Sequence, residues 1–162
     1  MRKSLTREIT VQGMIAAIYV VLNLTLQPIS FGPLQCRVSE ALTVLPFLNP
    51  FCTIGLTVGC LISNLIGGMG ILDVVFGVAA TFLSGIATSK MKRFWLAPLP
   101  PVILNAVIVG AVLTAVSVPR ELFFPTFWLY AAEVGAGEIG ACYILGLPLM
   151  NIVKHNGLFK TR

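Results

Sequence analysis

Long stretches without charge constrain this sequence more than any other feature. No residue from Ile9 to Leu26 or from Ala41 to Leu72 is charged. Only 10% of the 162 residues are charged and 57% are hydrophobic, whereas about a quarter of the residues in a soluble domain are charged. Uncharged runs of this length are typical of membrane-spanning helices. The sequence therefore predicts an all-α membrane protein, with residues 1–162 forming a single transmembrane domain.

Prolines, glycines and clusters of charge divide the chain into apolar segments. The run Gly67–Gly70 would interrupt any helix, and Pro98, Pro100 and Pro101 precede a later segment. The second span is shorter than the roughly 20 residues that a straight crossing needs, so we expect it to start in the preceding polar turn or to lie tilted. The six predicted spans are Ile9–Leu26, Ala41–Leu48, Phe51–Ile66, Ile71–Ala87, Val102–Val118 and Pro125–Met150.

Basic residues set the expected orientation, because cytoplasmic loops carry an excess of Lys and Arg. With six spans and a cytoplasmic N-terminus, only Arg37 and Arg120 lie outside. Five spans would move the basic group around Lys92 outside, so six spans with both termini in the cytoplasm are predicted. The basic residues then placed inside are Arg2, Lys3, Arg7, Lys90, Lys92, Arg93, Lys154, Lys160 and Arg162.

The basic residues also bear on targeting and on possible partners. The basic N-terminus resembles that of a signal peptide, but no small-residue cleavage site and polar region follow it, so we expect a retained first span. The net charge is +5, yet the basic residues lie at the ends of spans and form no stripe interleaved with aromatic residues. Nucleic acid is therefore not a predicted partner.

Motifs for metal binding and catalysis are missing from the sequence. The cysteines at positions 36, 52, 60 and 142 form no CxxC pair, so neither a metal, a cofactor nor a disulfide is predicted. The only histidine, His155, follows a lysine in the C-terminal tail, and no nucleotide-binding motif is present. A membrane-embedded enzyme that uses Glu133 and Glu138 stays open as an alternative, as does a scaffold without a ligand.

One polar segment, FGPLQCRVSEALTVLP (Phe31–Pro46), lies between the first two predicted spans. Arg37 and Glu40 are three residues apart, so they can pair on one side of a helix. This composition suits a lid over a pocket, and it also suits an ordinary polar turn at the membrane surface. The residues alone favour the turn.

Three acidic residues fall within or beside the later spans. A charged side chain at the centre of a membrane costs about 2.5–3.5 kcal/mol or more, so such residues are candidates for function. Glu133 and Glu138 are separated by about 140° around a helix and about 7–8 Å along it. One of them is therefore expected to face a pocket and the other to be held by a neighbouring helix. Asp73 could either line the pocket or satisfy the free amides of its own helix start.

Aromatic and amide side chains near these acids complete the candidate site. Trp128, Tyr130 and Phe76 could form a stacking wall for a flat ring, or an aromatic belt at the membrane interface. Asn64 could add an amide to the pocket. Asn105 is expected to hydrogen-bond between helices.

Pairs of small residues four positions apart let helices approach closely. Most such pairs are expected to pack inside the bundle. Gly13 and Ala17 are the expected exception, because a first helix has an outer face that is free for a partner.

Three stretches carry a resemblance to a known family: PISFGPLQCRVSEALTVLPFL (Pro28–Leu48), the run from Gly59 to Ser84, and GEIGACYILGLPL (Gly137–Leu149). The chain resembles the QueT family, substrate-binding S components of energy-coupling factor (ECF) transporters. The resemblance implies a multi-pass protein of the bacterial plasma membrane that captures a queuosine precursor from outside. A transmembrane coupling protein and two ATPase subunits, all on other chains, would drive uptake. The family's Ala-x-x-x-Ala pattern on the first helix reads here as Gly13 and Ala17.

The candidate residues suit the ligand class that this resemblance implies. A deazaguanine (preQ1, preQ0 or queuine) has a flat face and an N–H/NH₂ edge, which a carboxylate can bind through two parallel hydrogen bonds. Asp73, Glu133 and Glu138 outnumber the single nearby base, Arg37, which favours a neutral or cationic ligand. The pocket, with Arg37 and Glu40 above it, is expected on the outer side. Thiamin or another cationic aromatic vitamin stays open as the alternative.

Overall fold

The computed structural model describes residues 5–26, 37–68, 70–157 and 159. Every regular element within these residues is helical, which confirms the all-α prediction. The elements in order are α1 (Leu5–Thr25), the 3₁₀ helix η1 (Val38–Phe47), α3 (Cys52–Ile66), α4 (Ile71–Ser89), η2 (Phe94–Leu96), α5 (Leu99–Ser117), η3 (Arg120–Leu122), α6 (Phe123–Ile139), the π-helix η4 (Gly140–Gly146) and α7 (Leu147–His155).

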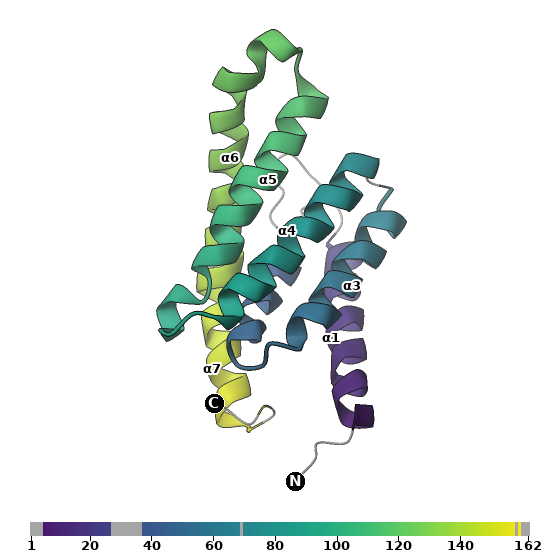
Figure 1. The fold of residues 1–162 in the computed structure, drawn as a ribbon, viewed down its shortest axis with the longest axis vertical. Helices are drawn as coiled ribbons and strands as arrows, with labels where there is room; N and C mark the ends of the chain where they lie inside the picture. The colour runs from purple at the N-terminus through teal and green to yellow at the C-terminus, as the bar shows by residue number, and fades with distance from the viewer. Residues whose placement is uncertain (1–4, 27–36, 69, 158, 160–162) are drawn as a thin grey trace.

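Successive helices pack side by side in one bundle, with α1 against α3, α3 against α4, α4 against α5 and α5 against α6 (Figure 1). The short helix η1 lies inside this bundle and contacts α1, α4 and η4. Its residues from Ser39 to Pro46 are all buried. An extended 3₁₀ helix is uncommon and often marks a hinge or a functional segment.

Four helical segments of the described chain are long and apolar enough to cross a membrane: Leu5–Thr25, Ile71–Ser89, Phe94–Ser117 and Arg120–His155. Val38–Phe47 and Cys52–Ile66 are shorter apolar helices. They correspond to the predicted second and third spans. The expected break between the third and fourth spans is present, and Gly68 there has a φ of +69°, which glycine adopts at little cost.

The helix that corresponds to the fifth predicted span, α5, starts earlier than predicted, at Leu99 instead of Val102. Pro100 and Pro101 lie in its first turn, where a backbone N–H has no acceptor within the helix, so proline is tolerated there. The prediction placed Pro100 and Pro101 before the start of the span, whereas both lie inside α5.

The last span continues from α6 through the π-helix into α7. Pro148 lies in the first turn of α7 and lacks the N–H that an α-helix would use four residues back. The wider π turn precedes it directly. Gly146 at the end of this turn lets η1 approach closely, because a Cβ there would lie 3.0 Å from the carbonyl oxygen of Ala41.

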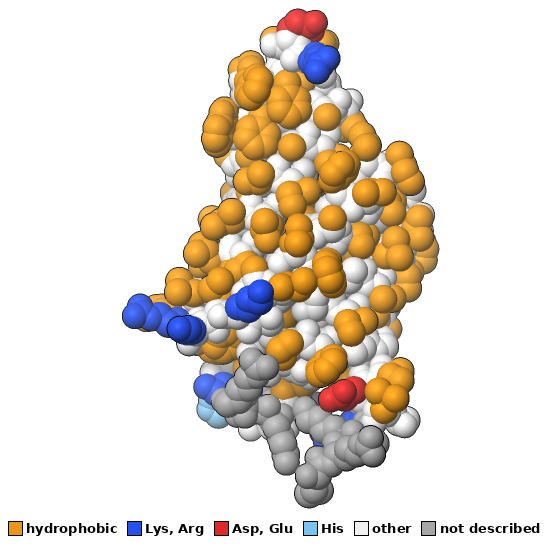
Figure 2. All heavy atoms as spheres, viewed as in Figure 1, with side chains coloured by type: hydrophobic (Ala, Val, Ile, Leu, Met, Phe, Trp, Pro, Cys, Tyr) orange, Lys and Arg blue, Asp and Glu red, His pale blue; other side chains and the backbone are white. Residues whose placement is uncertain are grey.

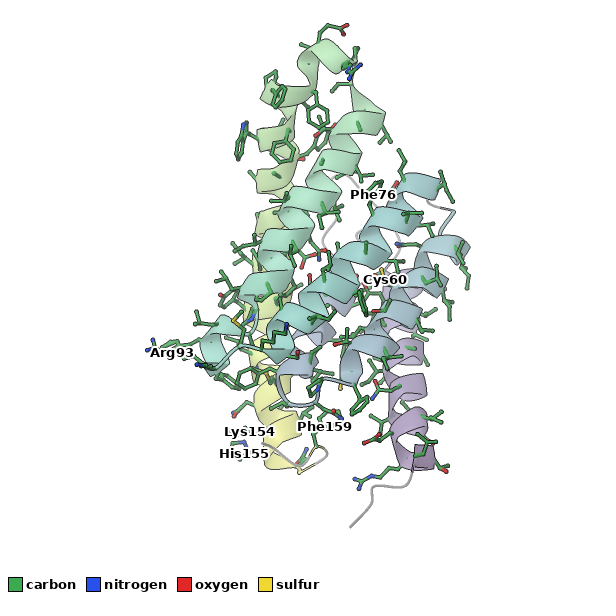
Figure 3. The ribbon with its side chains drawn as sticks, viewed as in Figure 1. Cys60, Phe76, Arg93, Lys154, His155 and Phe159 are labelled. Atoms are coloured by element: carbon green, nitrogen blue, oxygen red, sulfur yellow. The ribbon has the colours of Figure 1, made fainter. Side chains whose placement is uncertain are left out.

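On the face shown in Figure 2, charged side chains lie toward the two ends of the long axis, and the surface between them is mostly hydrophobic. Arg93, Lys154 and His155 lie at the end that also carries the start of α1 (Figures 1 and 3). Arg120 and Glu121 lie in η3, in the turn between α5 and α6 at the opposite end. The start of α1 and the end of α7 therefore share one end of the bundle, as the charge rule requires of two termini on one side of a membrane.

Candidate functional site

Two glutamates are sealed inside the bundle. Glu40 of η1 is 1% exposed and Glu138 of α6 is 4% exposed. A buried carboxylate is strongly unfavourable unless hydrogen bonds or opposite charges compensate it. The surroundings of these two side chains therefore define the site.

Asn105 of α5 joins the two glutamates. Its side-chain nitrogen Nδ2 donates a hydrogen bond of 2.7 Å to Oε1 of Glu138. The same nitrogen lies 3.5 Å from Oε2 of Glu40, a longer and weaker contact. Because an amide NH₂ carries two hydrogens, it can donate to both carboxylates at once.

The other two carboxylate oxygens also have donors. The hydroxyl of Tyr19 donates to Oε1 of Glu40. The thiol of Cys142 lies 3.4 Å from Oε2 of Glu138 and 3.4 Å from the backbone carbonyl oxygen of Glu40. Thr43 donates to that carbonyl oxygen at 2.6 Å. The site thus links α1, η1, α5, α6 and the π-helix.

Arg37 supplies positive charge at the same place. Its side chain is 6% exposed, and it interacts electrostatically with both Glu40 and Glu138. A small cavity of about 10 Å³ separates Arg37 from the α5 and α6 side chains. This volume is about enough for one water molecule. The cavity is lined by Arg37, Asn105, Val109, Val134 and Glu138.

A second chain of polar groups connects α1, η1 and α3. The hydroxyl of Ser39 donates to Oδ1 of Asn23 at 2.8 Å, and Nδ2 of Asn23 donates to the hydroxyl oxygen of Ser63 at 3.1 Å. Asn64 follows on α3 and donates to the backbone carbonyl oxygen of Asp73 at 3.4 Å. Its Oδ1 is buried without a hydrogen-bond partner among the described residues.

The structure brings together part of the set predicted from sequence. Arg37, Glu40 and Glu138 meet in the site, and Asn64 is fully buried on the neighbouring helix α3. As expected for two residues about 140° apart, Glu138 faces the interior and Glu133 does not join it. Glu133 is half-buried on α6.

The aromatic candidates lie elsewhere. Trp128 is 71% exposed and packs edge-on against Phe127 on α6, with ring centroids 5.2 Å apart. Phe76 is 45% exposed and lines an outward apolar groove between α4 and α5 (Figure 3). Tyr130 and Asp73 are half-buried. The positions of Trp128 and Phe76 fit the interfacial belt better than a stacking wall.

The interpretation of Phe31–Pro46 as a polar turn at the membrane surface is wrong for the described part of this segment. Arg37, Glu40 and the rest of η1 lie inside the bundle, because Tyr19 and Asn105 supply the hydrogen bonds that water would supply at a surface. Residues 31–36, which include Cys36, lie outside the described residues.

Two residues of the site, Tyr19 and Cys142, were missed from the sequence. Tyr19 is uncharged and lies within an apolar run, and the cysteines were considered as metal ligands or disulfide partners, so Cys142 was not a candidate. The spacing of Cys142, four residues after Glu138, was the available signal, because such residues are neighbours on a helix. Asn105 was expected to join helices and does so, but the sequence could not show that both of its acceptors are carboxylates.

Several membrane-length helices around a buried cluster of one arginine and two glutamates define a multi-pass membrane protein with a candidate polar site in its interior. The chain belongs to the QueT transporter family, whose family model matches residues 9–155. The resemblance seen in the sequence is thereby confirmed.

A curated relative shows a similar likeness over part of its length. The chain is 41% identical over 96 residues to the queuosine precursor transporter QueT of Lactococcus lactis subsp. cremoris (strain MG1363). This alignment covers 58% of the chain and 57% of that relative. No solved structure matches the chain.

Proposed function

We propose that this chain is the substrate-binding S component of an ECF-type importer, and that it captures a queuosine precursor from outside the cell. Membership of the QueT transporter family and the name of the Lactococcus lactis relative support the substrate. The sequence carries no nucleotide-binding motif, so ATP hydrolysis would take place on two partner ATPase subunits, joined to this chain through a transmembrane coupling protein.

The observation that carries the proposal is the pair of buried carboxylates at Glu40 and Glu138. A 7-deazaguanine presents an N–H and an NH₂ group side by side, and one carboxylate can accept both in a strong, charge-assisted pair of hydrogen bonds. The aminomethyl precursor also carries an ammonium group, which the second carboxylate can bind. Oδ1 of Asn64 on α3, which has no hydrogen-bond partner among the described residues, offers one further acceptor.

The charges of the site favour a cationic ligand over an anionic one. Arg37 carries one positive charge, whereas Glu40 and Glu138 carry two negative charges when both are ionised. A ligand with one positive charge would balance the site. An anionic vitamin would be repelled by both carboxylates.

Binding requires the site to open. The cavity of about 10 Å³ is far smaller than the roughly 300–1,000 Å³ of typical ligand pockets. The cavity is lined by α5, by α6 and by Arg37, which directly precedes the 3₁₀ helix η1. The π-helix η4 follows α6 directly, and helices of these two kinds often occur at hinges and functional sites. We expect η1 to move relative to α6 when the ligand enters.

The proposal includes a single transmembrane domain that crosses the plasma membrane of a bacterium six times, with both termini in the cytoplasm. The separation of charged side chains along the bundle supports this orientation. Single cysteines introduced at Lys92 and Arg120 would test it. Labelling of intact cells by an impermeant reagent should modify position 120 and spare position 92, and the reverse pattern would refute the orientation.

Ligand binding by the purified chain tests the function itself. Mass spectrometry of small molecules that co-purify with the detergent-extracted chain should find a 7-deazaguanine. Calorimetric titration should then show tighter binding of the aminomethyl-deazaguanine than of thiamin. Binding of thiamin alone, or of neither compound, would contradict the proposal.

A further inference from the structure

We propose that Asn105 is a positioning residue that holds Glu40 and Glu138 together as one two-carboxylate acceptor, and that it thereby determines the specificity of the site. This inference rests on the proposed function and adds a residue to it. Asn105 would act through the two glutamates, by fixing where their oxygens point before a ligand arrives.

The first support is the set of hydrogen bonds that the protein donates to the carboxylates of Glu40 and Glu138. Each of the four carboxylate oxygens accepts a hydrogen bond from a described side chain: from Tyr19 and Asn105 for Glu40, and from Asn105 and Cys142 for Glu138. A carboxylate has about four acceptor positions on its two oxygens. The protein donors therefore fix both side chains and still leave acceptor positions for a ligand.

The second support is the location of Asn105 at the cavity. Its side chain and that of Glu138 both line the cavity of about 10 Å³, opposite Arg37. Asn105 is 4% exposed and lies in a helix whose sequence is otherwise almost entirely apolar. A buried amide in such a helix needs partners, and both partners of its Nδ2 are carboxylates.

The third support is the close approach of α5 and α6. A Cβ at Gly110 would lie 2.9 Å from Cα of Ala131, so the two backbones are nearly in contact. This approach lets a side chain as short as asparagine reach Glu138. Without the bridge, Arg37 alone would offset the repulsion between the two carboxylates, which is strong in a medium of low dielectric constant and disfavours two neighbouring negative charges.

The consequence for specificity follows from the paired geometry. A ligand that brings donors to both carboxylates, such as a base with an amidine-like edge and a separate ammonium group, gains from the fixed pair. A base that has the N–H/NH₂ edge but no ammonium group can bind only one of the two carboxylates, so its affinity depends less on the fixed pair. The variant Asn105→Leu, which keeps the size but removes the donors, should therefore lose more affinity for the cationic deazaguanine than for the neutral nitrile analogue.

Calorimetric titration of both compounds tests this expectation. Asn105→Leu should weaken binding of the aminomethyl compound by about 10- to 100-fold, in the range for lost hydrogen bonds to charged groups. Thr114→Val is the matched control, because Thr114 is a fully buried polar residue of the same helix that bonds only to the carbonyl oxygen of Gly110 among the described residues. It should bind like the wild type.

A double-mutant cycle separates positioning from general destabilisation. If Asn105 acts through the two glutamates, the variant Asn105→Leu/Glu138→Gln should lose less affinity than the two single losses multiplied together. Losses that multiply, or equal losses for the cationic and neutral compounds, would overturn the inference.

A measurement without ligand keeps this result distinct from the proposed function. The infrared carboxylate band assigned to Glu138, by difference from Glu138→Gln, should shift in Asn105→Leu and stay in place in Thr114→Val. A shift in a chain that binds no deazaguanine would uphold the positioning by Asn105 and refute the proposed function. An unshifted band in a chain that binds deazaguanine would refute the positioning and leave the function intact.

Discussion

The hydroxyl of Tyr19 donates a hydrogen bond to the carboxylate of Glu40, 21 positions further along the chain. Both side chains are almost completely buried. The bond fastens α1 to η1 and brings the first helix into the site. The same helix exposes Gly13 and Ala17 on its outer side. One face of α1 therefore contacts the carboxylate cluster, while another is free at the surface of this chain.

Replacing Tyr19 with phenylalanine should destabilise the protein. The change removes the donor to Oε1 of Glu40 and leaves a buried acceptor without it, which typically costs about 1–3 kcal/mol. Thermal unfolding in detergent would measure the loss. Tyr143→Phe serves as the control, because Tyr143 is only half-buried on the π-helix. An unchanged unfolding temperature for Tyr19→Phe would show that the bond does not stabilise the fold.

The two glutamates of α6 should differ strongly in ligand binding. Removing one partner of a buried, charge-assisted contact costs about 2–5 kcal/mol, or roughly 30-fold to several thousand-fold in affinity. We expect Glu138→Gln to show a loss of this size, because Glu138 faces the cavity. Glu133→Gln should stay within about threefold of the wild type, as is usual for a position outside a site.

Calorimetric titration of folded samples distinguishes these two variants. A large loss in Glu133→Gln with little change in Glu138→Gln would place the ligand on the other side of α6. Similar affinity in both variants and in the wild type would mean that neither carboxylate binds the ligand.

The sequence predicted the helical segments well but the interior poorly. The break at Gly67–Gly70 and the apolar runs depend on local chemistry, so they could be read directly. The orientation of Trp128 could not be predicted in this way. A helix in water buries its apolar face, but lipid and protein interior are both apolar, so hydrophobicity does not show which face of a membrane helix points inward. The burial of Glu40 depends on donors from Tyr19 and Asn105, which are distant in sequence. Glu138 was identified because a charge within a long apolar run is unusual on its own.

Trp128 should contribute little to ligand affinity. A ring that stacks on a base contributes about 1–3 kcal/mol, and the sequence made Trp128 a candidate for that role. Its side chain is instead 71% exposed, beside Phe127. Trp128→Ala should therefore change the affinity by less than about 0.5 kcal/mol, which is typical of surface substitutions. A loss above 1 kcal/mol in the titration would return Trp128 to the site.

Gly13 should matter for assembly with the coupling protein and not for ligand binding. A Cβ at Gly13 would meet no atom within 4 Å, so the larger side chain of Gly13→Leu would project outward without disturbing the fold. If this face of α1 meets the partner through close helix packing, Gly13→Leu should abolish co-purification of the coupling protein and stop uptake. Ligand affinity of the isolated chain should stay within about twofold.

Gly59→Leu provides the matched contrast on the inner side of the same helix pair. A Cβ at Gly59 would lie 2.9 Å from Cβ of Tyr19 and 3.0 Å from the carbonyl oxygen of Ala16, so α1 would have to move away from α3. Overpacking of this kind typically costs about 1–3 kcal/mol, and it would displace Tyr19 from Glu40. Gly59→Leu should therefore lower both the unfolding temperature and the ligand affinity. If Gly13→Leu behaves in the same way, or if it assembles and transports normally, the outer face of α1 is not the surface that meets the coupling protein.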